Sequence, residues 1–143
     1  MDSTRIETRI GVRASAERIW DLVGDLDAWK QWNAYEQDVE GRIRQGGIVS
    51  FVENYPDLPA RQVNAVVGDW VPMGKLVLND KRGFLSTSSR FIILDEVEKE
   101  ATIVTMGIMF AGLRGEMYHD KHRGRIRRTM EALNEALKGA AER

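Results

Sequence analysis

Residues 14–33 read ASAERIWDLVGDLDAWKQWN, and no other part of the chain says as much about its architecture. Ser15 offers a side-chain oxygen that can cap a first helix over residues 16–23, whose second half is largely apolar. A glycine and an aspartate end that helix, and a second short helix is predicted over residues 28–32. Two short helices placed directly after a first strand are an unusual arrangement.

The sequence on both sides of this segment is typical of strands, followed by one long helix. A first strand is predicted at residues 5–13, and six more at 36–41, 47–55, 61–71, 75–80, 84–94 and 102–110. Short turns rich in glycine, proline and aspartate separate these six strands, so we expect antiparallel hairpins. No helical stretch lies between them, which argues against a parallel doubly wound sheet. The predicted class is α+β, a curved seven-stranded antiparallel sheet wrapped around a long C-terminal helix.

That last helix is predicted over residues 113–140. Its apolar positions are Leu113, Met117, Ile126, Met130, Leu133 and Leu137. The second group of these keeps helical spacing and should pack on the sheet. Between Met117 and Ile126 the apolar stripe is interrupted, and Asp120 and Gly124 stand near where it would continue. This gap indicates either that the helix borders a cavity there or that its first turns project beyond the sheet.

Composition narrows the class of protein. A chain of 143 residues fits one domain, predicted over residues 1–143, and it contains no cysteine, which excludes a disulfide scaffold and a thiolate zinc site. The net charge of −1 gives no reason to expect nucleic acid or anionic lipid as a partner. The polar start predicts no signal peptide, and the apolar runs are far shorter than the ~18 residues of a membrane span. We therefore expect a soluble, cytoplasmic protein.

The order of elements, together with residues 14–33, resembles the START-like or polyketide cyclase/dehydrase (SRPBCC) superfamily, which has the helix-grip fold. The features that carry the resemblance are Ala14, Trp20, Asp25, Trp29 and Trp32, with Gly41, Gly46 and the Val71-Pro72 step further on. A proline often follows the alanine in this family, whereas Ser15 stands here. The resemblance covers essentially the whole chain and implies a pocket between the sheet and the long helix. Such pockets bind lipids, sterols, polyketides, aromatic metabolites or hormones, and some relatives catalyse cyclisation, dehydration or hydrolysis.

Large apolar side chains are the candidate walls of such a pocket. We expect Trp32, Phe51, Met106 and Met117 to contact a ligand, with Gly124 beside them on the long helix. We expect no cofactor and no metal, because the two histidines, His119 and His122, are three residues apart and no third one exists. The oligomeric state stays open, with a homodimer among the alternatives.

Asp120 is the candidate catalytic residue. If its carboxyl group faces the cavity, apolar neighbours would favour the protonated form and allow it to exchange a proton with a substrate. Glu53 and Asp69 lie inside predicted strands, and either can point inward, because the register of strand pairing is not known from the sequence. The chain has no nucleophile elbow, phosphate loop or dinucleotide fingerprint.

Three functions fit these patterns. The first is a carrier or sensor that binds a small hydrophobic or aromatic molecule in an internal, largely apolar cavity. The second is an enzyme of the polyketide cyclase or dehydratase kind that uses a cavity carboxylate as acid and base. The third is an interaction protein with a filled interior and an exposed apolar patch. The sequence favours the first over the second.

Overall fold

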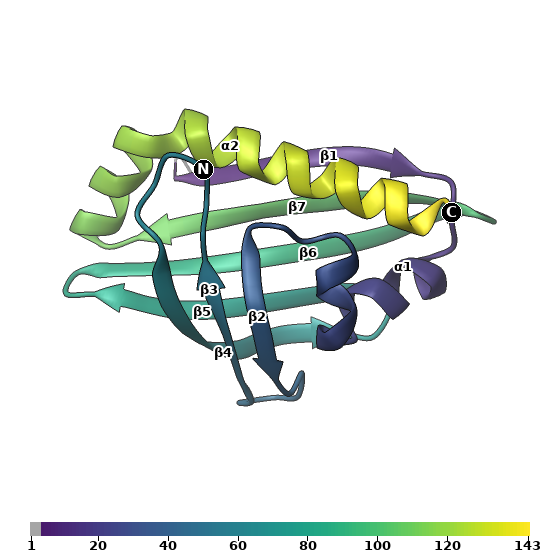
Figure 1. The fold of residues 1–143 in the computed structure, drawn as a ribbon, viewed down its shortest axis with the longest axis horizontal. Coiled ribbons are helices and arrows are strands. Elements are labelled where there is room, and N and C mark those ends of the chain that lie inside the picture. The colour runs from purple at the N-terminus through teal and green to yellow at the C-terminus, as the bar shows by residue number, and fades with distance from the viewer. Residues whose placement is uncertain (1–3) are drawn as a thin grey trace.

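One antiparallel sheet holds all seven strands of the computed structural model, which describes residues 4–143 (Figure 1). The strands are β1 (Arg5–Val12), β2 (Glu36–Gly41), β3 (Ile48–Glu53), β4 (Arg61–Val71), β5 (Lys75–Gly83), β6 (Ser86–Glu98) and β7 (Ala101–Ala111). Their order across the sheet is β1-β7-β6-β5-β4-β3-β2, so consecutive strands from β2 to β7 pair with one another. β1 joins the sheet beside β7 and leaves both edges unclosed.

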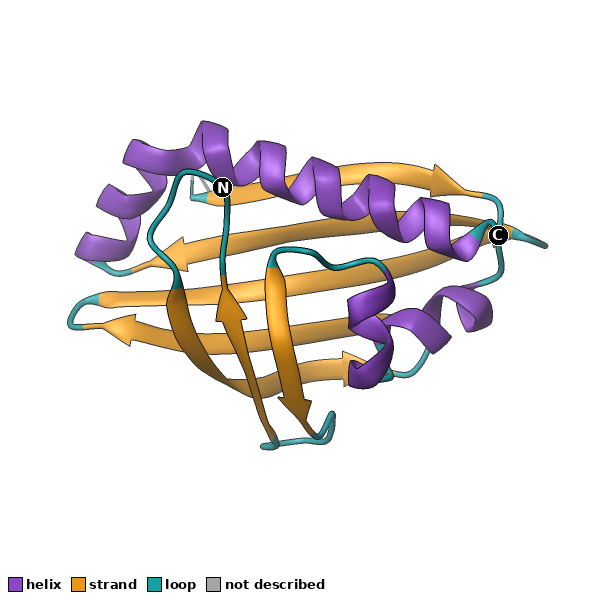
Figure 2. Cartoon of the chain, viewed as in Figure 1, coloured by secondary structure: helices purple, strands orange, loops and turns teal. Residues whose placement is uncertain are grey.

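The long helix α2 (Leu113–Ala141) lies across β1, β7 and β6, and the sheet curls so that β2 and β3 cross in front of the central strands (Figures 1 and 2). The short helices α1 (Ala16–Val23) and η1 (Leu26–Gln31) follow β1 and lie near the C-terminal end of α2. The predicted fold class is confirmed. No helix within residues 4–143 is long and apolar enough to cross a membrane.

Two tryptophans explain why the segment 14–33 folds as it does. The Ser15 side chain accepts a hydrogen bond from the Arg18 backbone N–H, as expected of a helix N-cap. The indole N–H groups of Trp29 and Trp32 donate to the carbonyls of Val23 and Leu22, each at 2.8 Å. These bonds satisfy carbonyls at the end of α1 that have no partner within the helix. They hold α1 against η1.

The side chains of β7 alternate, and its even-numbered residues from Thr102 to Phe110 are buried. The free edge of β1 is covered by polar side chains of α2. Arg127 and Lys138 each donate to a β1 carbonyl at 3.1 Å, those of Glu7 and Gly11, and the Asn134 amide lies between them. Such contacts occupy backbone acceptors through which an edge strand could otherwise pair with another chain.

The β5–β6 hairpin differs from its prediction. Residues 80–83 were expected to form the turn, whereas β5 continues to Gly83 and the chain turns at residues 84–85. The same alternation therefore carries on past Asp80, and the Arg82 side chain joins Asp80 on the concave face. The second short helix is a 3₁₀ helix that begins two residues earlier than expected, because Asp25 caps it by accepting from the Asp27 N–H.

Candidate functional site

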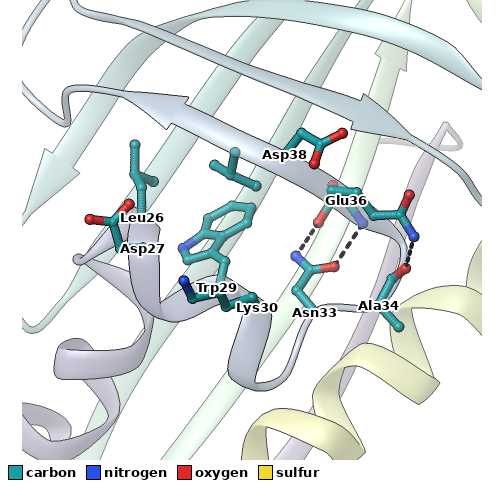
Figure 3. Close-up of a pocket in the computed structure, with 10 residues that line it drawn as sticks. Leu26, Asp27, Trp29, Lys30, Asn33, Ala34, Glu36 and Asp38 are labelled. Atoms are coloured by element: carbon teal, nitrogen blue, oxygen red, sulfur yellow. Dashed lines mark hydrogen bonds between the residues drawn. The ribbon is translucent and has the colours of Figure 1, made fainter.

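The concave face of the sheet carries buried charged groups where an apolar lining was expected. The deepest is the carboxylate of Glu36, at the start of β2, whose side chain is 0% exposed. Asn33 positions it: the Asn33 amide donates to Glu36 Oε1 at 2.9 Å and accepts from the Glu36 backbone N–H at 2.9 Å (Figure 3). The loop between η1 and β2 thus orients this acid.

Two further side chains complete what we call the Glu36 network, consisting of Asn33, Glu36, Tyr55 and Arg90. The Arg90 guanidinium donates to both carboxylate oxygens of Glu36, at 3.0 and 3.1 Å, and the Tyr55 hydroxyl donates to Oε2 at 2.8 Å. Arg90 Nη1 also donates to the carbonyls of Phe91 and Gly107. Every charge in the network has partners, which buried charges require.

Burial sets the protonation of this network. Desolvation, with the nearby carboxylates of Glu36 and Glu53, raises the pKa of the Tyr55 phenol well above its ordinary value of 10.0. Burial alone would lower the pKa of Arg90, but attraction to Glu36 outweighs it and the pKa is raised. The phenol therefore stays protonated and can donate a hydrogen bond over the whole neutral range.

A second group, which we call the ion-pair cluster, contains Glu53, Arg61, Asp80 and Arg82. Arg82 binds Glu53 through two bonds, of 2.9 and 3.1 Å, and Arg61 binds Asp80 at 2.6 Å. Longer contacts link these two ion pairs, Arg61 to Glu53 at 3.9 Å and Arg82 to Asp80 at 4.0 Å. Two carboxylates thus balance two guanidiniums, and Arg61, at 26% exposure, is the member that reaches solvent most.

Aromatic rings hold Arg82 in place. Its guanidinium carbon lies 5.3 Å from the ring centroid of Phe110 and 5.0 Å from that of Tyr118, within the range of cation–π attraction. Burial tends to lower the pKa of Arg82, yet the hydrogen-bonded carboxylate of Glu53 raises it overall. Partial burial raises the pKa of Tyr118 as well, although Arg82 opposes this shift.

Open space at this site is divided between a small cavity and a surface groove. Between the two charged groups lies a cavity of about 10 Å³, room for about one water molecule, whose walls include Phe51, Val63, Leu78 and Ile108. Outside the ion-pair cluster is a groove of about 270 Å³, which we call the hairpin groove. It is lined by Arg61, Arg82, Gly83, Phe84, Ser86, Arg114 and Tyr118. Arg61 and Arg82 separate the groove from the interior.

The hairpin groove lies where the β5–β6 turn meets the start of α2, at the left of Figure 1. Four large apolar side chains are exposed at this end: Phe84, Leu85, Leu113 and Met117. A different groove, of about 530 Å³, lies between η1 and β2, and Glu36 is among the residues that line it (Figure 3). Its lining mixes Trp29 and Leu26 with charged side chains such as Asp27, Lys30 and Asp38.

The structure separates the residues predicted to bind a ligand into two sets. Trp32, Phe51 and Met106 are buried, and of these Phe51 lines the small cavity. Met117, Asp120 and Gly124 lie on the outer side of α2: Met117 is 61% exposed, and the Asp120 side chain is 76% exposed and bonded to the neighbouring His119. These three residues do not face the sheet, so the condition for Asp120 to act in a cavity is not met.

The reason is the course of the buried stripe along α2. It runs through Gly115, His119 and Ile126, which occupy one side of the helix. Met117, Asp120 and Gly124 fall about a third to half a turn away from that side. The apparent gap between Met117 and Ile126 is thus occupied by the buried His119 and the half-buried His122, not by a cavity.

The remaining candidates are placed as follows. Glu53 points inward and joins the ion-pair cluster, whereas Asp69 points outward, is 68% exposed and pairs with Lys75 at 2.6 Å. The His122 ring packs edge-on against Tyr118, and burial together with Lys121 and Arg125 lowers its pKa. Within residues 4–143, no three His, Asp or Glu side chains are grouped to hold a metal ion.

Sequence reasoning missed Glu36, Arg90 and Arg82, which dominate the concave face. A signal was present in the hairpin register. Phe110 faces inward, and its partner in β6 is Ser88, so Arg90 shares that face with Ile92 and Leu94. Both alternate sets of β6 contain apolar residues, however, and periodicity alone does not choose between them.

This architecture is the polyketide cyclase-type, or SRPBCC, fold, with a polar site at one end of the concave face. No protein-family model matches the sequence, and no curated protein matches it. The chain is similar to the crystal structure of the Zhui aromatase/cyclase from Streptomyces sp. R1128, with a TM-score of 0.77 and 17% identity over 97% of this chain and 93% of that one.

Two further solved structures are similar. The solution structure of the KanY protein has a TM-score of 0.76 and 13% identity, and the match covers 100% of both chains. The di-domain ARO/CYC StfQ from the steffimycin biosynthetic pathway has a TM-score of 0.75 and 13% identity over 97% of this chain and 50% of that one. Likeness at these identities establishes the fold, not the function.

Proposed function

We propose that this protein binds a small hydrophobic or aromatic molecule at the hairpin groove and the concave face beneath it, as a carrier or sensor. The observation that carries the proposal is the hairpin groove, because its Phe84 and Tyr118 offer aromatic surface where Arg61 and Arg82 stand between solvent and the concave face. Beyond those arginines lie Phe51, Val63 and Leu78, an apolar wall for the body of a ligand.

The present volume of about 10 Å³ behind the arginines is far below the ~300–1,000 Å³ of typical ligand sites. A ligand therefore occupies the hairpin groove and enters further only as the ion-pair cluster opens. The arrangement of Arg61 near the surface, with a single short bond to Asp80, makes it the side chain that moves most readily.

Binding is tested with N-phenyl-1-naphthylamine, an uncharged aromatic probe whose fluorescence rises in apolar surroundings. We expect saturable binding with one site per chain, weakened several-fold by Phe84→Ala, because an exposed ring that covers a ligand contributes about 0.5–1.5 kcal/mol. Asp120→Asn serves as the control and should leave binding unchanged, since that side chain faces solvent. Absence of saturable binding to the folded protein would contradict the proposal.

An enzymatic role of the polyketide cyclase or dehydratase kind is the second candidate, favoured by the Glu36 network. A buried carboxylate hydrogen-bonded to a phenol whose pKa is raised, beside a guanidinium, is an arrangement that can orient and stabilise an enolate. Similarity to a protein described as an aromatase/cyclase supports this candidate.

The test uses heptane-2,6-dione, which closes by intramolecular aldol condensation to 3-methylcyclohex-2-enone with loss of one water molecule. Enone formation above the uncatalysed rate, lost in Glu36→Gln but retained in Asp120→Asn, would assign the acid/base role to Glu36. The reverse pattern would assign it to Asp120. If the wild-type protein does not accelerate the reaction but still binds the probe, the enzymatic candidate is rejected and the carrier role is the one that stands.

A further inference from the structure

The charges that line the hairpin groove are all of one sign. Arg61, Arg82 and Arg114 contribute guanidiniums to its wall, and no carboxylate lines it. The balancing carboxylates of Glu53 and Asp80 line the small cavity on the inner side instead. The groove therefore presents a positive surface to solvent, although the cluster behind it is neutral.

Two of these guanidiniums, those of Arg61 and Arg114, have N–H donors that are not used in ion pairs. Arginine has five N–H donors, and Arg61 uses one nitrogen, Nη1, for its carboxylate partners. Arg114 forms no ion pair within residues 4–143. Arg82 lies against the rings of Phe110 and Tyr118, so its charge is already in place before any ligand arrives.

We infer that the ligand of the hairpin groove is amphipathic, with an anionic group such as a carboxylate or sulfonate that pairs with Arg114 and Arg61 and an apolar body that lies on Phe84 and Tyr118. This inference rests on the proposed function and names the class of its ligand. The exposed ring of Phe84, at 75%, lies in the same groove as the three arginines, so both halves of such a molecule find a partner.

Side chains, and not the end of α2, supply this recognition. The backbone N–H groups of Arg114 and Gly115 already donate to the Leu85 carbonyl, at 2.9 and 3.3 Å, and that of Glu116 donates to Gly112. These donors are therefore not available to an anion. Substitution of the arginines, rather than of the helix cap, is the decisive experiment.

The experiment compares two probes that differ by one group. 1-Anilinonaphthalene-8-sulfonate is N-phenyl-1-naphthylamine with an added sulfonate, and titration calorimetry gives the dissociation constant and stoichiometry of each. We expect the sulfonate to bind more tightly at low salt and to lose this advantage as the salt concentration rises, because screening weakens exposed charge pairs.

Arg114→Gln is the diagnostic variant, and Arg123→Gln, an exposed arginine of the same helix that does not line the hairpin groove, is its matched control. Arg114→Gln should raise the dissociation constant of the sulfonate by about 3–10-fold, the effect of one partly exposed charge-assisted contact, and that of the uncharged probe by less than about twofold. Arg123→Gln should change neither.

The possible outcomes distinguish failure of this inference from failure of the proposed binding function. If the uncharged probe binds but the sulfonate binds no more tightly, or if Arg114→Gln affects both probes alike, the anionic class is overturned and the binding function stands. If neither probe binds the folded protein, the proposed function itself fails.

Discussion

Single residues on the concave face decide the chemistry of this molecule. Glu36, Arg90 and Tyr55 are buried, yet each makes at least one hydrogen bond to another of the three. A buried pair of this kind adds little net stability but is costly to break, because the remaining charge is left without a partner. The strand β2, which is an edge strand, is therefore tied to β6 across the interior by this one carboxylate.

The Tyr55 phenol makes stability depend on pH in the alkaline range. Its pKa is raised in the folded state, so above pH 10.0 the folded chain binds more protons than the unfolded chain. The free energy of unfolding should be unaffected by this group below pH 10 and should then fall as the pH rises, by up to about 1.4 kcal/mol per pH unit.

Urea unfolding of the wild type and of Tyr55→Phe between pH 8 and pH 11.5 measures this dependence. The variant should be less stable at pH 8, because Glu36 loses a donor, and should show a shallower alkaline decline. An identical decline in both proteins would refute the assignment to Tyr55.

Among the elements, α2 has two glycines, one at its N-terminus and one in its interior, whose substitution should affect stability in opposite directions. Gly112, which precedes α2, has φ of +82°, and an added Cβ would clash with the Leu85 carbonyl. Gly124 lies inside the helix, where an added Cβ would meet only the end of the Arg128 side chain, at 3.6 Å. Both residues are glycines, but only Gly112 has a backbone conformation that other residues rarely adopt.

Alanine substitutions should therefore change stability in opposite directions. Gly112→Ala should lower the free energy of unfolding by about 1–3 kcal/mol through backbone strain. Gly124→Ala should raise it by about 0.5–1 kcal/mol, because alanine favours the helix. Chemical denaturation checks both, and destabilisation by Gly124→Ala would mean that this side of α2 is packed rather than exposed.

Across the whole molecule, α2 joins the two ends of the chain into one unit. It packs on β1 and β7, which pair with each other although they lie at opposite ends of the strand sequence. Leu137, which is fully buried, contributes to this contact, whereas Met117 faces away from it. Loss of packing under α2 should therefore unfold the sheet together with the helix.

Leu137→Ala should destabilise the protein by about 2–5 kcal/mol, and Met117→Ala should change stability by less than about 0.5 kcal/mol. Tryptophan fluorescence, which reports η1 and its surroundings, and circular dichroism at 222 nm, which is dominated by α2, should give the same transition. Separate transitions would show that helix and sheet unfold independently.

Structural features that depend on interactions between residues close in sequence were predicted correctly, and those that depend on residues far apart in sequence were not. The segment 14–33 and the strand β7 were predicted well because caps, turns and alternation act over a few residues. The prediction of a turn at residues 80–83 was wrong, because charged residues inside a strand resemble a turn sequence until their ion-pair partners are known. Arg82 belongs to the strand, since Glu53, 29 residues away, neutralises it.

The amino-acid sequence by itself determined the order of elements, the antiparallel hairpins and the long C-terminal helix, since local propensity and pattern are written along the chain. Only the tertiary structure decided which face of β6 and of α2 turns inward, and hence that Glu36, Arg90 and Arg82 are buried on the concave face while Asp120 meets solvent. The physical reason is that burial and charge pairing depend on partners far apart in sequence, which strand register and the curvature of the sheet bring together.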